Sequence, residues 1–123
     1  MCIRDRLTAS SATWEPDRVE EVTVVAVAKI KPEHEERALE LLRGVIAASH
    51  GEDGCVKYTL HRSKNEPGAF SIVERWRSQA DLDAHFGQPH MAPMQEVFRY
   101  LEEPPTILFC DPVPAGDEAK GLL

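Results

Sequence analysis

The chain has 123 residues, of which 42% are hydrophobic and 28% charged, and this fits one domain with a modest core. The net charge of −7 and the scattered Lys and Arg residues argue against nucleic acid or an anionic membrane as partner, because both bind to clusters of positive charge. No apolar run approaches the roughly 18–20 residues of a membrane helix. Three Cys residues (Cys2, Cys55 and Cys110) are too few and too widely spaced for a disulfide framework or a zinc motif.

The composition divides the chain into three segments. Residues 1–18 show no usable periodicity, and their opening MCIRDR resembles non-native or read-through sequence, so we expect a disordered segment outside the fold. The charges there leave no apolar stretch for a secretion signal, and together with the cysteine pattern this predicts a cytoplasmic protein with reduced thiols. Residues 19–112 form the predicted domain. Residues 113–123 are rich in Pro and Gly, which predicts a flexible tail or an arm that reaches a neighbour.

The first half of the domain predicts a strand, a helix and a hairpin. Val22–Ile30 is β-branched and almost continuously apolar, which indicates a strand buried on both faces. A helix follows from Pro32 to the region of Gly51, and Cys55–Arg62 and Ala69–Trp76 form a hairpin across the turn sequence SKNEPG. The apolar stripe of the helix comprises Ala38, Leu41, Leu42, Val45 and Ile46. The first hairpin strand places Val56, Tyr58 and Leu60 on one face.

The second half predicts short helices and a last strand. Ser78 with Asp81 three residues later resembles a capping box, and Gly87 and Pro89 end the helix that it begins. A second short helical stripe comprises Met91, Met94, Val97, Phe98 and Leu101. The sequence TILFC from Thr106 then predicts the last strand.

The order β-α-β-β-α-(α)-β predicts an α+β fold of the ferredoxin-like type, βαββαβ. Its antiparallel sheet carries the helices on one face, so the other face is bare in a monomer. Because Val22–Ile30 is apolar on both sides, we expect two sheets to pack face to face in a symmetric homodimer.

Several polar and aromatic residues converge on the predicted sheet–helix interface. Strand alternation places Glu74 and Trp76 on one face, together with Phe70 and Ile72. In the following helix Leu82, His85 and Phe86 share a face, so His85 points at the sheet. We therefore expect a cavity whose wall carries Trp76 and His85, with Glu74 and His90 close by. A neutral His in an apolar pocket can accept a proton from a weakly acidic substrate such as a phenol.

Structural roles are the competing interpretation for the same residues. His85 can fill space while bonded to a backbone carbonyl, and Trp76 can be core. Glu74 can be an edge residue paired with Arg75 or Arg62, and His90 can cap the next helix. Met91 and Met94 can be core residues.

Other kinds of site have weaker support. Glu74, His85 and His90 are acceptable metal ligands, but Pro89 separates the two histidines and no recognised motif is present, so we predict no metal site. Cys55 and Cys110 lack an adjacent base for covalent catalysis. No glycine-rich loop follows a strand, so no nucleotide site is predicted.

The segment IVERWRSQADLDAHFGQPHM, residues 72–91, resembles the central motif of the antibiotic biosynthesis monooxygenase family, especially its quinol-monooxygenase-like members. VTVVAVAKIKPEHEERALELL and EDGCVKYTLHR resemble the first strand and helix and the second strand of that family. The resemblance implies a dimeric α+β barrel that oxygenates a small aromatic or quinol-like substrate with O₂ and without a cofactor. Haem-degrading relatives of this fold use an asparagine on the first strand, and Val22–Ile30 contains none.

The resemblance also implies roles for single residues. His85 is the expected base, Trp76 has a positioning or electrostatic role, and Glu74 is the third catalytic candidate. The expected substrate-binding positions are His90, Ile72, Phe86, Met91, Met94 and Tyr58.

Three functions are consistent with this sequence. The first is a cofactor-independent monooxygenase that acts on a quinol, phenol or related aromatic. The second is an isomerase or tautomerase that uses His85 as a proton shuttle in the same pocket. The third is a non-catalytic, dimeric small-ligand-binding module.

Overall fold

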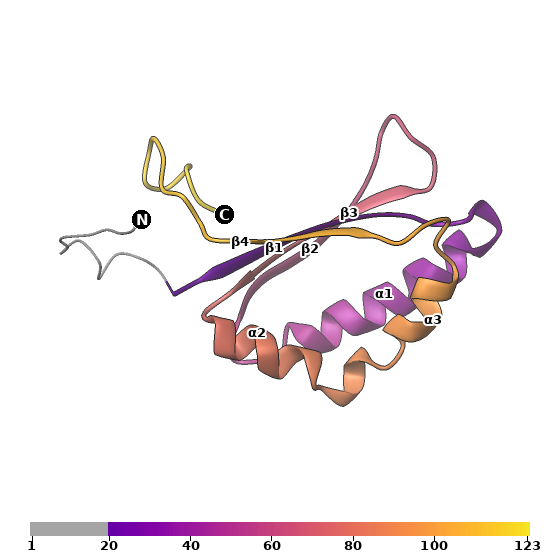
Figure 1. Ribbon diagram of the computed structural model, residues 1–123, viewed down its shortest axis with the longest axis horizontal. Helices are drawn as coiled ribbons and strands as arrows, with labels where there is room; N and C mark the ends of the chain where they lie inside the picture. Colours follow the sequence, from indigo (N-terminus) through magenta and orange to yellow (C-terminus); the bar gives the residue numbers. More distant parts are fainter. Residues whose placement is uncertain (1–19) are drawn as a thin grey trace.

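In residues 20–123 four strands and three α-helices follow one another in the order that the sequence predicts (Figure 1). A computed structural model describes residues 20–123, and the expectation for residues 1–18 lies outside this part of the chain. The strands are β1 (Val22–Lys29), β2 (Cys55–Arg62), β3 (Ala69–Trp76) and β4 (Thr106–Cys110). The helices are α1 (Glu35–Ser49), α2 (Gln79–Phe86) and α3 (Met94–Arg99), with short 3₁₀ helices at Pro32–His34 and Pro89–Met91.

The strands form one antiparallel sheet in the order β2-β3-β1-β4, and the helices lie on one face of it (Figure 1). This confirms the α+β, ferredoxin-like prediction. None of the helices in residues 20–123 combines the length and the apolar character that crossing a membrane requires.

One row of the sheet positions the site described below. Val24 on β1 pairs with Glu74 on β3 and with Phe109 on β4, and Glu74 also pairs with Tyr58 on β2. Because directly paired residues point to the same face of a sheet, these four side chains share the face that the helices cover.

The prediction that Val56 shares a face with Tyr58 and Leu60 is wrong. The register of β2 against β3 shifts between Cys55 and Lys57, so one extra residue interrupts the alternation. Cys55 consequently packs against the apolar core, whereas Val56 is exposed. Nothing in the local sequence distinguishes this irregular strand from a regular one.

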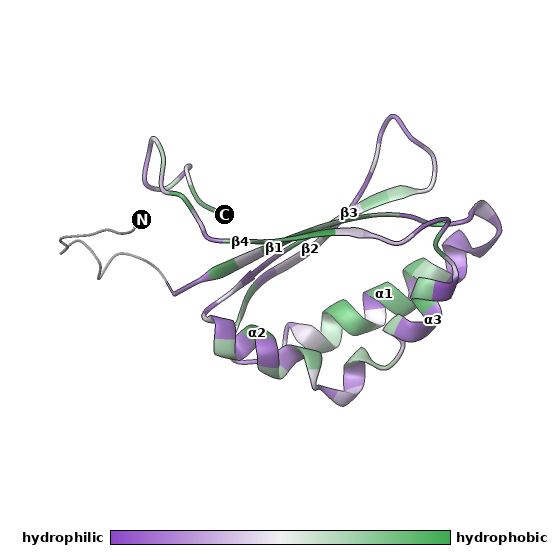
Figure 2. Cartoon of the chain, in the orientation of Figure 1, coloured by the Kyte–Doolittle hydropathy of each residue, from purple (hydrophilic) through white to green (hydrophobic). Residues whose placement is uncertain are grey.

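Two apolar clusters hold the helices on the sheet. One joins α1 and α3 to the sheet around Ile30, Leu42 and Phe70, and the other joins α2 around Trp76 and Leu82. The stripe predicted for α1 is buried except for Leu41, which is partly buried, and Leu39 is buried in addition. Figure 2 shows apolar residues along β1 and β4 and a mixture of polar and apolar residues on the helices, which is typical of helices with one buried face.

The start of α2 confirms Ser78 as the N-cap, which is one half of the predicted capping box. The backbone N–H of Asp81 donates a hydrogen bond to Ser78 Oγ at 3.1 Å, and Arg77 Nε donates to Asp81 Oδ2 at 2.8 Å. Gly54 lies against the same aspartate, and a Cβ at this glycine would come within 2.3 Å of Asp81 Cβ. These contacts fix α2, and therefore His85, against the end of the sheet.

The opposite face of the sheet is partly apolar. Val25 on β1 pairs with Val73 on β3 and Leu108 on β4, and Val27 lies two residues along β1 on the same side. Val27 and Leu108 are about half exposed, and no helix of residues 20–123 covers this face.

Replacing Trp76 by Ala tests how much this buried indole contributes to the stability of the core. The indole is 0% exposed, so we expect the free energy of unfolding to fall by about 3–5 kcal/mol in urea denaturation. Phe98→Ala is the matched control, because that ring is half exposed and its removal should cost much less. A Trp76→Ala protein as stable as Phe98→Ala would contradict the core position of the indole.

Candidate active site

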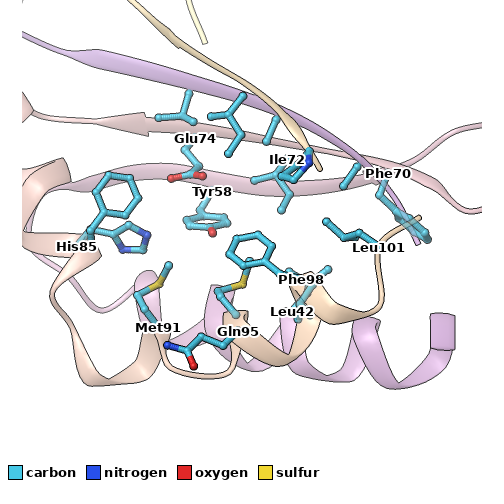
Figure 3. A pocket seen from close by; sticks show the side chains of 18 of the residues that line it. Leu42, Tyr58, Phe70, Ile72, Glu74, His85, Met91, Gln95, Phe98 and Leu101 are labelled. Carbon is cyan, nitrogen blue, oxygen red and sulfur yellow. The ribbon is translucent and has the colours of Figure 1, made fainter. Parts of the chain in front are cut away.

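A cavity of about 390 Å³ lies between the sheet and the helices (Figure 3). Its wall is almost entirely apolar, and it extends from Phe70 and Leu101 at one end to His85 at the other (Figure 3). The buried polar side chains of the wall, those of Tyr58, Glu74 and His85, gather at one end of the cavity (Figure 3). The cavity therefore suits a ligand that is apolar over most of its surface and carries a polar group at one end.

Glu74 projects from β3 into this polar end. It is 8% exposed, and Trp76 Nε1–H donates a hydrogen bond to its Oε1 at 2.8 Å. Burial raises the pKa of Glu74 above its ordinary value, and the Trp76 hydrogen bond and nearby His85 only partly offset this effect. A carboxyl group held in this way can act as a proton donor at a higher pH than a solvated one.

His85 is the most enclosed ionisable side chain of this wall, at 1% exposure. Its Nδ1 lies 2.7 Å from Glu52 Oε2. Because a carboxylate accepts hydrogen bonds, Nδ1 carries the proton and the neutral ring has its free electron pair on Nε2. Among residues 20–123 Nε2 has no hydrogen-bond partner, so a ligand proton can be transferred to it.

The Trp76 indole lies beside the imidazole, with ring centroids 4.5 Å apart at an interplanar angle of 38°. Tyr58 meets both rings edge to face, at 6.5 Å from Trp76 and 5.9 Å from His85. This aromatic packing, together with the Glu52 contact, restricts the imidazole to one orientation.

Tyr58 places a hydroxyl at the same end of the cavity (Figure 3). The side chain is buried, and within the described part of the chain its hydroxyl makes no hydrogen bond. Burial, and after it the charge of Glu74, raise the pKa of Tyr58. Tyr58 is therefore a neutral hydrogen-bond donor and acceptor that is available to a ligand.

Glu52 is a site residue that the sequence pattern does not predict. This residue lies in the turn between α1 and β2, and its Oε2 contacts both His85 Nδ1 at 2.7 Å and His90 Nε2 at 2.8 Å. A turn has no periodicity that assigns a direction to a side chain. The only signal was an acidic residue within EDGCVKYTLHR, a segment that resembles the family.

The structure brings most of the predicted site residues together. Seven of them line the cavity, namely Tyr58, Ile72, Glu74, His85, Phe86, Met91 and Met94. Trp76 and His90 do not line it, although Trp76 was expected on its wall and His90 among the substrate-binding residues. Trp76 lies behind Glu74 and His85, because it is covered where β3 meets α2, and His90 contacts Glu52 instead.

Three structural alternatives for these residues are wrong. Glu74 is not paired with a nearby arginine, because Arg75 binds Glu21 and Arg62 contacts Glu35. The hydrogen-bond partner of His85 is a carboxylate rather than a backbone carbonyl. His90 makes no side-chain cap of a helix in residues 20–123.

Comparison with known proteins identifies the family of the chain. The model of the family described as "Antibiotic biosynthesis monooxygenase" matches residues 21–97, which is more than half of the chain. The chain belongs to the antibiotic biosynthesis monooxygenase family. The match includes β1, Glu52, Glu74, Trp76, His85 and His90.

Curated relatives extend the family match to individual proteins. An uncharacterised protein of Synechocystis is 30% identical over 87 residues, 71% of this chain and 55% of the relative, so the chain spans about half of that protein. A Mycobacterium tuberculosis protein named "Putative monooxygenase Rv0793" is 36% identical over 69 residues, 56% of this chain and 67% of the relative.

Solved structures of the family have the same fold. The structure of the Mycobacterium protein has a TM-score of 0.73 at 30% identity and covers 79% of this chain and 99% of its own. A structure described as an antibiotic biosynthesis monooxygenase has a TM-score of 0.72 at 29% identity, with 76% and 99% covered.

Replacing Glu74 by Gln tests the buried carboxyl group through the pH dependence of stability. The raised pKa means that the folded protein binds this proton more tightly than the unfolded chain. Wild-type stability therefore falls as the pH rises from the ordinary value of 4.5 to the raised one. Gln still accepts the Trp76 hydrogen bond but cannot ionise. We expect the stability of the variant relative to wild type to increase across this window, as measured by urea denaturation.

Glu33→Gln is the control for the loss of one negative charge, because Glu33 is exposed. A relative stability of Glu74→Gln that stays constant or declines with rising pH would be inconsistent with a raised pKa at this position.

Proposed function

We propose that this protein is a monooxygenase that oxidises a small quinol, phenol or related aromatic compound with O₂. The observation that carries the proposal is the Glu52–His85 pair, which leaves His85 Nε2 as a proton acceptor at the polar end of an apolar cavity. The membership of the family and the printed names of its relatives support the same reaction class.

In the first step His85 Nε2 accepts a proton from a phenolic hydroxyl of the substrate. The imidazolium ion that forms is stabilised by Glu52, whose Oε2 is 2.7 Å from Nδ1. Tyr58 and Glu74 lie at the same end of the cavity and can donate hydrogen bonds to the substrate oxygen. Trp76 does not contact the substrate; it positions Glu74, because its N–H donates a hydrogen bond to the carboxyl group.

In the second step the electron-rich phenolate reacts with O₂ at a ring carbon, which gives a peroxide. The peroxide then takes up the proton held by His85. The ring carbon loses its C–H proton as the O–O bond breaks and hydroxide leaves. The proton and the hydroxide form water, and one oxygen atom stays on the ring as a carbonyl. For a hydroquinone the products are a hydroxyquinone and one water, so the substrate supplies all four electrons that O₂ accepts. The apolar lining of the cavity admits O₂ and excludes water that would solvate the phenolate.

An isomerase or tautomerase is the second candidate. The observation that favours it is the placement of a base, His85, and an acid of raised pKa, Glu74, at one end of the same cavity. Two such groups can remove a proton from one atom of a substrate and return it to another. Turnover without O₂ would select this candidate over the monooxygenase.

The monooxygenase is tested by O₂ consumption with a panel of hydroquinones, naphthols and anthrone-type compounds. We expect His85→Ala to lower the turnover rate by about 10²–10⁴-fold, as loss of a general base does. Glu52→Gln should also lower it, because an amide can donate to Nδ1 and impose the opposite tautomer. Mass spectrometry with labelled O₂ should find one labelled oxygen atom in the product.

His61→Ala is the matched control, because this histidine is exposed and its ring contacts Thr59 rather than the cavity. Equal O₂ consumption by wild type, His85→Ala and His61→Ala would reject the proposed base. If none of them turns over any compound of the panel but the wild type still binds one, the non-catalytic binding module would be favoured.

We propose further that the protein is a homodimer in which the outer sheet faces pack together. The half-exposed Val27 and Leu108, next to Val25 and Val73, support this arrangement. Leu108→Glu should convert a dimer into a monomer in sedimentation experiments, because it places a charge in the proposed interface. Val113→Glu, on the exposed chain beyond β4, should leave the dimer intact. A monomeric wild-type protein would overturn the proposal.

A further inference from the structure

Three metal-ligating side chains converge behind the wall of the cavity. Glu52 comes from the turn after α1, His85 from α2 and His90 from the 3₁₀ helix Pro89–Met91. Their nearest ligand atoms, Glu52 Oε2, His85 Nδ1 and His90 Nε2, all lie within 4.8 Å of one another. In the part of the chain that the structure describes, no other group of three His, Cys, Asp or Glu residues meets in this way.

We infer that Glu52, His85 and His90 form a binding site for a divalent transition metal such as Zn²⁺. Two imidazoles and one carboxylate suit zinc and its first-row neighbours, whereas Mg²⁺ and Ca²⁺ prefer all-oxygen sites. The carboxylate of Glu52 offsets one of the two positive charges of the ion. The sequence predicts no metal site because Pro89 separates the histidines and Glu74 is the nearest candidate carboxylate, whereas in the structure Glu52 provides the carboxylate.

The three residues must shift to hold an ion, because their ligand atoms are not yet at the spacing of a metal site. Glu52 Oε2 lies 2.7 and 2.8 Å from the two ring nitrogens. Around a tetrahedral zinc with bonds of about 2.0–2.1 Å, neighbouring ligand atoms are roughly 3.3 Å apart. Each distance from Oε2 to a ring nitrogen must therefore lengthen by about half an ångström, and the two ring nitrogens, whose separation is at most 4.8 Å, must come to the same spacing. Glu52 belongs to a turn, which accommodates such a shift more easily than the helix that carries His85.

The surroundings allow an ion to enter from one side. The side chain of His90 is 24% exposed and that of Glu52 is 13% exposed, whereas that of His85 is 1% exposed. Ser49 Oγ lies 3.4 Å from His90 Nε2 and adds a neutral oxygen near the site. Neither Glu52 nor His90 lines the cavity, so the ion would sit behind the cavity wall rather than among the substrate-binding residues.

Metal binding has a consequence for His85, and this part rests on the proposed function. An ion on Nδ1 occupies the electron pair there, so the proton of the neutral ring must reside on Nε2. The nitrogen that faces the cavity then donates a hydrogen bond and no longer accepts a proton. The metal would therefore inhibit the proposed oxygenation rather than assist it.

The site is tested on the full chain without a histidine tag. Titration with Co²⁺ should produce visible absorption bands that saturate at one equivalent, and added Zn²⁺ should remove them. His90→Ala and Glu52→Gln should each weaken Zn²⁺ binding in calorimetry by more than the 10–100-fold that loss of an outer-shell partner costs. His61→Ala should bind as wild type does, because His61 lies exposed on β2.

Two results would overturn the inference. One is the absence of Co²⁺ and Zn²⁺ binding by the folded wild-type protein at millimolar metal. The other is unchanged Zn²⁺ affinity in both His90→Ala and Glu52→Gln, with circular dichroism showing that the variants are folded. Neither readout depends on turnover, so the metal site can fail while the proposed oxygenation stands, and the reverse also holds.

Discussion

The hydrogen bond between Glu52 and His85 is the contact on which the chemistry of the cavity depends. A buried imidazole without a partner could place its proton on either nitrogen, and the cavity would face a donor in one case and an acceptor in the other. The carboxylate removes this ambiguity, because it can only accept a hydrogen bond and therefore requires the proton of His85 to be on the contacting Nδ1. The capped start of α2 and the close approach of Gly54 to Asp81 then hold the ring where the cavity begins.

The second constraint is the cost of burying charge beside an apolar cavity. Glu74 and Tyr58 share one row of the sheet and both have raised pKa values because burial disfavours their charged forms. The Trp76 N–H donates a hydrogen bond to one oxygen of Glu74. The carboxyl group of Glu74 lines the cavity and can make further hydrogen bonds there. The polar end of the cavity thus offers a ligand hydrogen bonds that the protein itself leaves unmade.

Periodicity predicted the direction of side chains in regular elements and failed where the backbone is irregular. Alternation along β3 placed Glu74 on the helix-facing side, and helical spacing pointed His85 at the sheet, as observed. The register shift in β2 exposed Val56, and the turn before β2 concealed the role of Glu52, because neither has a period. Alternation also predicts which face of the sheet a side chain lies on but not whether other side chains cover it. It therefore could not show that Trp76 lies behind the cavity wall rather than on it.

In the two proposals the same three side chains serve a base and a metal ligand set, and the two proposed roles compete for one electron pair. With Nδ1 protonated, Glu52 accepts two N–H groups on a single oxygen, an arrangement that helps to satisfy the buried carboxylate without any ion. An ion of higher charge can replace both protons at once, since it binds the same three atoms. The arrangement that makes His85 a base therefore also makes it sensitive to transition metals, and the concentration of free metal would decide which form of the cavity wall prevails.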